Sequence, residues 1–495
     1  MRATYDALMA YTKRTVALSQ VAGLLGWDQE TMMPPGAAGQ RGEWRGAMEE
    51  IIHARQSAPE VGAWLARLEG ADLGDEASAN LRHIRRTFQR ATRVPADLAA
   101  ELARVTSVSQ GIWARARAAD DFAAFAPTLK QVLDLKREEA AALSDGDGTD
   151  AYDALLQDYE PGMSGARLQA LLGELRAGLV DLRDRIRGST RQIPALSRSF
   201  DHAGQMALAH DLAGVFGYDW SRGRLDLAVH PFSSGSGFDT RITTRVDEKN
   251  PFNCFYSTIH ETGHACYEQG ISAAYLMTPL GRGVSMGVHE SQSRIYENQL
   301  GRSAPFCGWL FQRMQTEFGD FGVPDADAFY ALVNQVGQGY IRTEADEVQY
   351  NLHVLLRFDL ERALISGALE VSDLEDAWNA RFLADFGFAV DRPSNGVLQD
   401  VHWSVGLFGY FPTYSLGNVY AGGLYQALCA AVPTLEADLA RGETAAATEW
   451  LRDNVQKYGG LFEPADLIER ATGAPISARP LLDYLERKFT AIYRL

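Results

Sequence analysis

The stretch RLQALLGELRAGLVDLRDRIR (167–187) decides the fold class. Its leucines recur every three or four residues, and arginines and acids fill the positions between them. This spacing puts the leucines on one stripe of an α-helix and the charges on the opposite side. The run is too short for a coiled coil, so it predicts a helix packed inside a domain. The stripe consists of Leu168, Leu171, Leu172, Leu175, Leu179 and Leu182.

The same period returns along most of the chain, which predicts a mainly α protein. Further helical patterns cover 1–20, 40–68, 76–92, 95–143, 202–216, 285–300, 326–365, 371–386, 415–432, 434–457 and 479–492. Only RLDLAVHPF (224–232) and DTRITTRVD (239–247) alternate apolar and polar residues. With the turn SSGSG between them they predict a small β-sheet.

No repeat and no linker rich in proline or serine divides the chain. We therefore expect one large domain over 1–495, with a helical N-terminal part (1–200) and a catalytic part (201–495) that carries the motifs described below. An all-α bundle with a separate N-terminal domain is the alternative.

The overall charge and the cysteines bound the partners and the location. A net charge of −17 over 495 residues argues against nucleic acid and anionic membranes as partners. Four cysteines in so long a chain do not suggest a disulfide framework. The N-terminus has an amphipathic helix pattern and not that of a signal peptide, and no run of 18 uncharged apolar residues occurs. We expect a cytoplasmic protein.

A loop rich in glycine and aspartate, LSDGDGTDAYD (143–153), has some likeness to a calcium-binding loop. Asp150 stands where an EF-hand requires glycine. The sequence therefore does not predict a calcium site there.

The stretch STIHETGHACYEQG (257–270) contains the candidate chemistry. On a helix, His260 and His264 lie one turn apart on the same face, so both imidazoles can bind one ion. Glu261 lies about 100° further round, where it can hold a water molecule without being a ligand. The alternative is an ordinary helix with two hydrogen-bonded histidines and a surface glutamate.

A catalytic zinc ion needs three protein ligands and one open position. The following segment GRGVSMGVHESQSRIYENQL (281–300) offers His289, Glu290 and Glu297. The two glutamates are seven residues apart and share a helix face, so helix geometry leaves the choice between them open.

HETGH followed by HESQ resembles the carboxypeptidase Taq family of HExxH metallocarboxypeptidases. Other signatures of that family occur here in the family's order, and the likeness covers nearly the whole chain. They are WDQETMMPPG (27–36), HPF (230–232), DTRIT (239–243), IRTEAD (341–346) and GVLQDVHW (396–403).

The resemblance implies zinc ligation by His260, His264 and Glu290, one ion per chain with cobalt as the alternative metal, and Glu261 as the catalytic carboxylate. It also implies a helical domain with a deep active-site groove, broadly similar to neurolysin and angiotensin-converting enzyme, and a homodimer.

The reaction implied is hydrolysis of the C-terminal peptide bond by a metal-activated water. Its oxyanion needs a hydrogen-bond donor besides the metal. The segment 399–420 resembles the one that supplies a histidine and a tyrosine to the intermediate in angiotensin-converting enzyme, which favours His402 and Tyr410. The zinc histidines need a carboxylate partner for their second nitrogen. Asp346 and Asp400 are the candidates for that role, and His289 is a candidate hydrogen-bonding neighbour.

A carboxypeptidase must also bind the free C-terminal carboxylate of its peptide, and arginine suits this best. Arg342 in IRTEAD is the favoured residue. Arg241 has Asp239 two residues before it on the same strand face, so a local ion pair is equally expected. His230 is a candidate substrate contact or a structural hydrogen-bonding residue. The rival functions are an endopeptidase or dipeptidyl-peptidase on the same scaffold, and a peptide-binding protein without activity.

Overall fold

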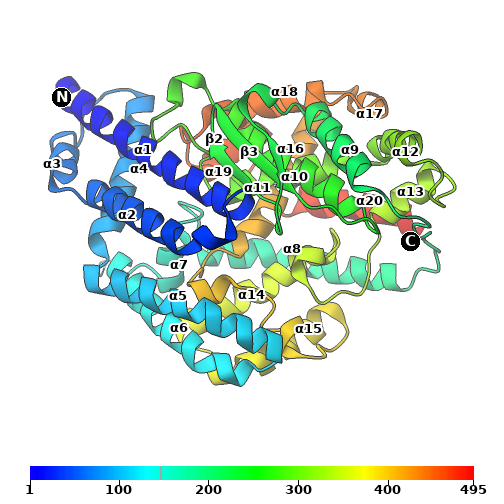
Figure 1. Ribbon diagram of the computed structural model, residues 1–495, viewed down its shortest axis with the longest axis horizontal. Coiled ribbons are helices and arrows are strands. Elements are labelled where there is room, and N and C mark those ends of the chain that lie inside the picture. Colours follow the sequence, from blue (N-terminus) through cyan, green and yellow to red (C-terminus); the bar gives the residue numbers. More distant parts are fainter. Residues whose placement is uncertain (145, 147) are drawn as a thin grey trace.

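The computed structural model describes every residue of the chain except 145 and 147. It is a mainly helical molecule with one small sheet (Figure 1), which confirms the expected fold class. Helices α1–α4 lie at one side of the view in Figure 1, and α5 and α6 lie along its lower edge, away from the strands.

The α-helices are α1 (Arg2–Thr31), α2 (Ala38–Gln56), α3 (Pro59–Arg67), α4 (Asp75–Arg93), α5 (Ala96–Ala119), α6 (Phe122–Ser144), α7 (Ala151–Leu156), α8 (Gly165–Arg187), α9 (His202–Val215), α10 (Phe252–Gly270), α11 (Met286–Arg294), α12 (Ala304–Phe318), α13 (Ala326–Val333), α14 (Gln349–Ser366), α15 (Leu374–Phe386), α16 (Pro412–Ala431), α17 (Leu435–Leu439), α18 (Ala445–Asn454), α19 (Pro464–Thr472) and α20 (Arg479–Tyr493).

Four predicted helices are each two α-helices in the structure, and three α-helices were not predicted. The pattern 434–457 forms α17 and α18. The pattern 95–143 breaks at Asp120, whose backbone is left-handed (φ 54°). The pattern 40–68 breaks just before Pro59, because proline disfavours the helical conformation of the residue it follows. The pattern 326–365 is interrupted by the glycine-containing loop 334–348, which carries the short helix η5 (Arg342–Glu344). Helices α7, α12 and α19 had no predicted counterpart.

The sheet differs from the predicted hairpin. Strand β1 (Leu225–Leu227) pairs in parallel with β3 (Asp239–Thr244), and the segment expected to be the turn forms β2 (Ser233–Ser236), antiparallel to β3. The true turn is Gly237–Phe238, between the paired residues Ser236 and Asp239. Gly237 has a φ of 60°, which is typical of the first position in a two-residue hairpin turn.

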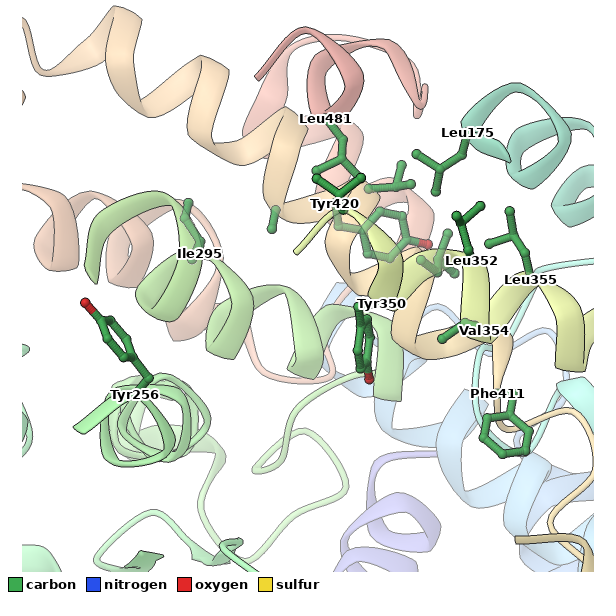
Figure 2. Packing of buried hydrophobic residues seen from close by; sticks show 14 of the residues in the cluster. Leu175, Tyr256, Ile295, Tyr350, Leu352, Val354, Leu355, Phe411, Tyr420 and Leu481 are labelled. Atoms are coloured by element: carbon green, nitrogen blue, oxygen red, sulfur yellow. The ribbon is translucent and has the colours of Figure 1, made fainter. Parts of the chain in front are cut away.

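One large hydrophobic core unites the two predicted parts of the chain. It contains buried residues from Val105 to Tyr493. In Figure 2, Leu175 of α8 lies beside Leu352 and Leu355 of α14. A smaller separate cluster joins α1, α3 and α4. No helix among the described residues is long and apolar enough to cross a membrane.

The glycine- and aspartate-rich loop at 143–153 includes residues 145 and 147, which lie outside the described residues. Its Asp150 is the N-cap of α7: the carboxylate accepts hydrogen bonds from the backbone N–H groups of Tyr152 and Asp153. This capping accounts for the aspartate at that position.

Candidate metal centre

Helix α10 carries the HETGH sequence, and Gly263 lets a second helix come close to it. A Cβ on Gly263 would lie 2.5 Å from the carbonyl oxygen of Gln292 and 2.7 Å from Cα of Ser293, both on α11. Only glycine permits this approach. The crossing brings His260 and His264 of α10 next to α11.

Helix α11 carries Glu290 and is held at its N-terminal end and along its side. The Ser285 hydroxyl caps it, and the buried Glu160 carboxylate accepts a hydrogen bond from the Gly287 N–H at 2.9 Å. On its other side Gly417 of α16 packs on Glu290, since a Cβ there would lie 2.6 Å from the Cβ and Cγ of Glu290. The position of Glu290 is therefore fixed by its neighbours.

His260, His264 and Glu290 form a compact cluster whose ligand atoms all lie within 4.8 Å of one another. Oε2 of Glu290 is 3.7 Å from Nε2 of His260 and 3.4 Å from Nε2 of His264. Both Nδ1 atoms are hydrogen-bonded elsewhere, which leaves Nε2 of each ring for an ion. Two imidazole nitrogens and one carboxylate are the protein ligands typical of a catalytic zinc ion.

Glu297 lies beside the cluster and not in it. Its Oε2 is 2.9 Å from Nδ1 of His260. After Arg294 the helix continues as a π-helix (Ile295–Gly301), and this changes the register that would have put Glu297 above Glu290. Arg294 and Arg302 also donate hydrogen bonds to the Glu297 carboxylate.

His264 has a different neighbour. Its Nδ1 lies 2.6 Å from Nδ1 of His289, whose Nε2 lies 3.0 Å from Oε1 of Glu268. The expectation that Asp346 or Asp400 supports the histidines is wrong. The Asp346 carboxylate binds Gln349 and nearby backbone N–H groups, and Asp400 binds two arginines.

Burial and the neighbouring charges tune the groups of the cluster. Burial lowers the pKa of His264 to about 3, so its ring is neutral, as a metal ligand must be. Burial raises the pKa of Glu261 to about 7, and the Glu290 and Glu297 carboxylates also raise it. Burial opposes ionisation of Glu290 too, but Arg294 and the two histidines hold its pKa well below the usual range.

Tyr410 and His402 lie side by side near the cluster, their ring centres 5.6 Å apart. Burial raises the pKa of Tyr410, and the nearby Glu290 carboxylate also raises it, so the phenol keeps its proton. Burial lowers the pKa of His402 to about 4, which keeps this ring neutral. Nε2 of His402 is 3.4 Å from the hydroxyl of Tyr414.

Arg342 is buried in a network of charges and aromatic rings. Its Nε and Nη2 both donate to Oδ1 of Asp400, at 3.1 and 3.0 Å, and Nη1 donates to the hydroxyl of Tyr350 at 3.3 Å. The guanidinium lies 5.0 Å from the ring centre of Tyr414. Asp400 also binds the fully buried Arg357.

Arg241 and His230 lie further from the cluster. Arg241 forms the local ion pair with Asp239 and stacks on Trp27 at 4.2 Å. The side chain of His230 is exposed. None of the contacts described for these two residues reaches the three clustered ligand groups.

Two cavities reach the outer carboxylates of the site. A cavity of about 670 Å³ between α1, α4 and β2 is lined by Glu268 and Arg241, among others. A cavity of about 540 Å³ is lined by Arg294, Glu297 and Tyr350. Neither cavity is lined by His260, His264 or Glu290.

A helical fold in which an HExxH helix crosses a helix that presents a glutamate defines the class of HExxH metallopeptidases. A model of the carboxypeptidase Taq (M32) metallopeptidase family matches residues 7–489. The chain belongs to this family and is a metallocarboxypeptidase.

Relatives support this assignment over the full length. Thermostable carboxypeptidase 1 of Thermus thermophilus is 42% identical, over 99% of each chain. Carboxypeptidase 1 of Bacillus subtilis is 33% identical, over 98% of this chain and 97% of the relative. The crystal structure of an M32 carboxypeptidase from Deinococcus radiodurans R1 superposes with a TM-score of 0.95 at 39% identity, covering 100% of both chains.

Proposed function

We propose that this metallocarboxypeptidase is zinc-dependent and removes single residues from the C-termini of peptides, with Glu261 as the general base. The observation that carries the proposal is the cluster of His260, His264 and Glu290, with Glu261 buried next to it. The donor set of two Nε2 atoms and one carboxylate oxygen fits zinc, or cobalt in its place. Bound zinc would polarise the scissile carbonyl and lower the pKa of a water molecule towards 7.

Glu261 handles the proton in this proposal. Its carboxyl has a pKa of about 7, mainly because it is buried, and a general base is most effective when its pKa is close to the working pH. It accepts the proton of the attacking water and later passes one to the departing amine. No protein nucleophile is required.

Tyr410 and His402 are the proposed donors to the oxyanion. Both stay in the required protonation state at neutral pH, the phenol protonated and the imidazole neutral. Nδ1 of His402 is buried and lies 3.9 Å from Oδ1 of Asp400, so Nε2 is the nitrogen that we propose donates to a bound peptide. Fixed donors of this kind stabilise developing negative charge without reorganisation.

Arg342 is the residue that we propose binds the C-terminal carboxylate of the peptide. Asp400 and Tyr350 engage three of its five N–H groups, which leaves one on Nη1 and one on Nη2. Asp400 and the surrounding rings hold the guanidinium in place, so little side-chain entropy is lost on binding. Arg241 lines the larger cavity and would contact the upstream part of the peptide there, and the exposed His230 remains a second candidate contact.

Substrates that differ only at the C-terminus test the exopeptidase proposal. Peptides with a free carboxylate should release one amino acid per cleavage, and their C-terminal amides should react about 10²-fold more slowly, as expected for loss of one buried charged pair. Equal rates on both, or release of internal fragments, would favour an endopeptidase or a dipeptidyl-peptidase. Binding without cleavage by the zinc-loaded protein would favour the peptide-binding alternative.

The assembly and the location are further proposals that rest on the sequence. We propose a homodimer, and light scattering should then give a particle of twice the chain mass. We also propose a cytoplasmic location, with which the absence of disulfides among the four cysteines agrees.

A further inference from the structure

The second histidine of the HExxH pair is supported through another histidine. For His264 to offer Nε2 to an ion, its proton must be on Nδ1. That nitrogen lies 2.6 Å from Nδ1 of His289, which must then be the acceptor. An imidazole that accepts at Nδ1 can donate at Nε2, and Nε2 of His289 lies 3.0 Å from Oε1 of Glu268.

The proton positions along this row are therefore fixed by the carboxylate at its end. Glu268 accepts from His289, and His289 accepts from His264. We propose that His289 and Glu268 are positioning residues that lock His264 in its metal-binding tautomer and orientation, as Glu297 does directly for His260. This inference rests on the proposed role of His260, His264 and Glu290 as metal ligands.

The surroundings hold the row in place. Glu268 is only 6% exposed, and the backbone N–H of Gly283 donates to its Oε1 at 2.9 Å. A Cβ on Gly283 would lie 2.6 Å from Cδ2 of His289, so a glycine there allows the ring to fit. The centre of the His289 ring also lies 5.1 Å from the centre of the Tyr267 ring.

The helix itself brings Glu268 to this place. His260, His264 and Glu268 follow one another at intervals of four on α10, so they lie on one face at successive turns. His260 contacts the Glu297 carboxylate directly, whereas His264 is connected to the Glu268 carboxylate through His289. The two carboxylates, Glu297 and Glu268, lie at opposite ends of the row of histidines.

Zinc affinity measured by competition with a chromophoric chelator tests the inference without relying on activity. His289→Phe keeps a flat ring but removes the acceptor, and we expect it to weaken zinc binding by about 10- to 100-fold. Glu268→Gln removes the charge at nearly constant shape and should weaken binding by about tenfold. His353→Phe is the matched control: His353 is a buried histidine whose ring nitrogens have no partner among the described residues, so zinc affinity should not change.

The double variant tests whether Glu268 acts through His289 or whether the two residues affect zinc binding independently. Because Glu268 acts through His289, His289→Phe with Glu268→Gln should bind zinc as tightly as His289→Phe alone. Full additivity of the two losses, or unchanged affinity in His289→Phe, would overturn the inference. If His289→Phe does not fold, unchanged affinity in Glu268→Gln overturns it. Failure of the wild type to bind zinc through His260, His264 and Glu290 would instead overturn the proposed function.

Discussion

Nδ1 of His260 lies 2.9 Å from Oε2 of Glu297, and this contact assigns a place to the glutamate that helix geometry could not separate from Glu290. Glu297 contacts His260, a proposed ligand, and does not take part in the cluster. A carboxylate that accepts from a metal-bound imidazole fixes the ring and increases its basicity. The two glutamates should therefore differ in how much metal binding depends on them.

Replacement of each glutamate should reveal this difference. Glu290→Ala removes one of the three proposed ligands, so the purified protein should no longer bind zinc. Glu297→Gln keeps a hydrogen-bond acceptor and should retain one zinc per chain, with affinity lowered by up to about tenfold. Metal content and competition with a chelator measure both. Loss of zinc from Glu297→Gln with retention in Glu290→Ala would contradict the assignment.

Glu261→Gln should separate catalysis from metal binding. Glutamine has the same shape but cannot accept a proton from water, so kcat should fall about 10²- to 10⁴-fold while zinc stays bound. Steady-state kinetics and metal analysis of one preparation check this. More than about a tenth of wild-type activity would exclude Glu261 as the base.

Arg342→Ala should lower kcat/KM on free peptides about 10²-fold, on the order of 3 kcal/mol. The variant also leaves Asp400 with only Arg357 as an arginine partner, so its stability will fall. A comparison within the variant avoids that complication. Amidation of the peptide should cost the variant little, because the two changes remove one interaction. If amidation lowers kcat/KM equally in the wild type and in Arg342→Ala, Arg342 does not bind the C-terminal carboxylate.

The sequence predicts which site residues share a helix face wherever the helix is regular. The spacing of His260 and His264 places them on one face, and the same argument extended by four residues would have found Glu268. The role of Glu297 was not predictable from spacing, because the π-helix after Arg294 changes the register, and no local pattern marks that change.

Contacts between residues far apart in the sequence also limit what the sequence predicts about the strands and the side-chain partners. The residues SSGSG have turn composition, yet Ser233–Ser236 form a strand because β3 offers them an edge to pair with. Asp346 and Asp400 were plausible partners for histidines, but their actual partners come from distant contacts and from the local backbone.

Gly263→Ala should disturb the metal centre through packing alone. The new methyl group would lie 2.5 Å from the Gln292 carbonyl, which forces α10 and α11 apart and costs about 1–3 kcal/mol. Zinc affinity should fall with the thermal midpoint. Gly173→Ala in α8 is the control, since its site is open and a helical alanine should stabilise by about 0.5–1 kcal/mol. An unchanged midpoint in Gly263→Ala would contradict the close crossing.

Glu361 should make stability depend on pH. It is fully buried on α14, and Trp403, Tyr152 and the Gly409 N–H donate hydrogen bonds to it. Burial raises its pKa to about 7, although these donors and Arg357 favour the ionised form. Between the usual glutamate pKa and 7, the folded state holds a proton that the unfolded state has lost. The stabilisation is therefore complete below about pH 4.3 and disappears as the pH rises through 7.

Glu361→Gln removes this titration and keeps a neutral, hydrogen-bonding side chain. The wild type should lose up to about 3 kcal/mol relative to the variant between pH 5 and pH 8. Thermal midpoints of both proteins at the two pH values measure this loss. Glu160 is also buried with a pKa of about 7, but it titrates in both proteins and cancels in the comparison. A difference between wild type and variant that is the same at pH 5 and pH 8 would show that Glu361 is ionised throughout.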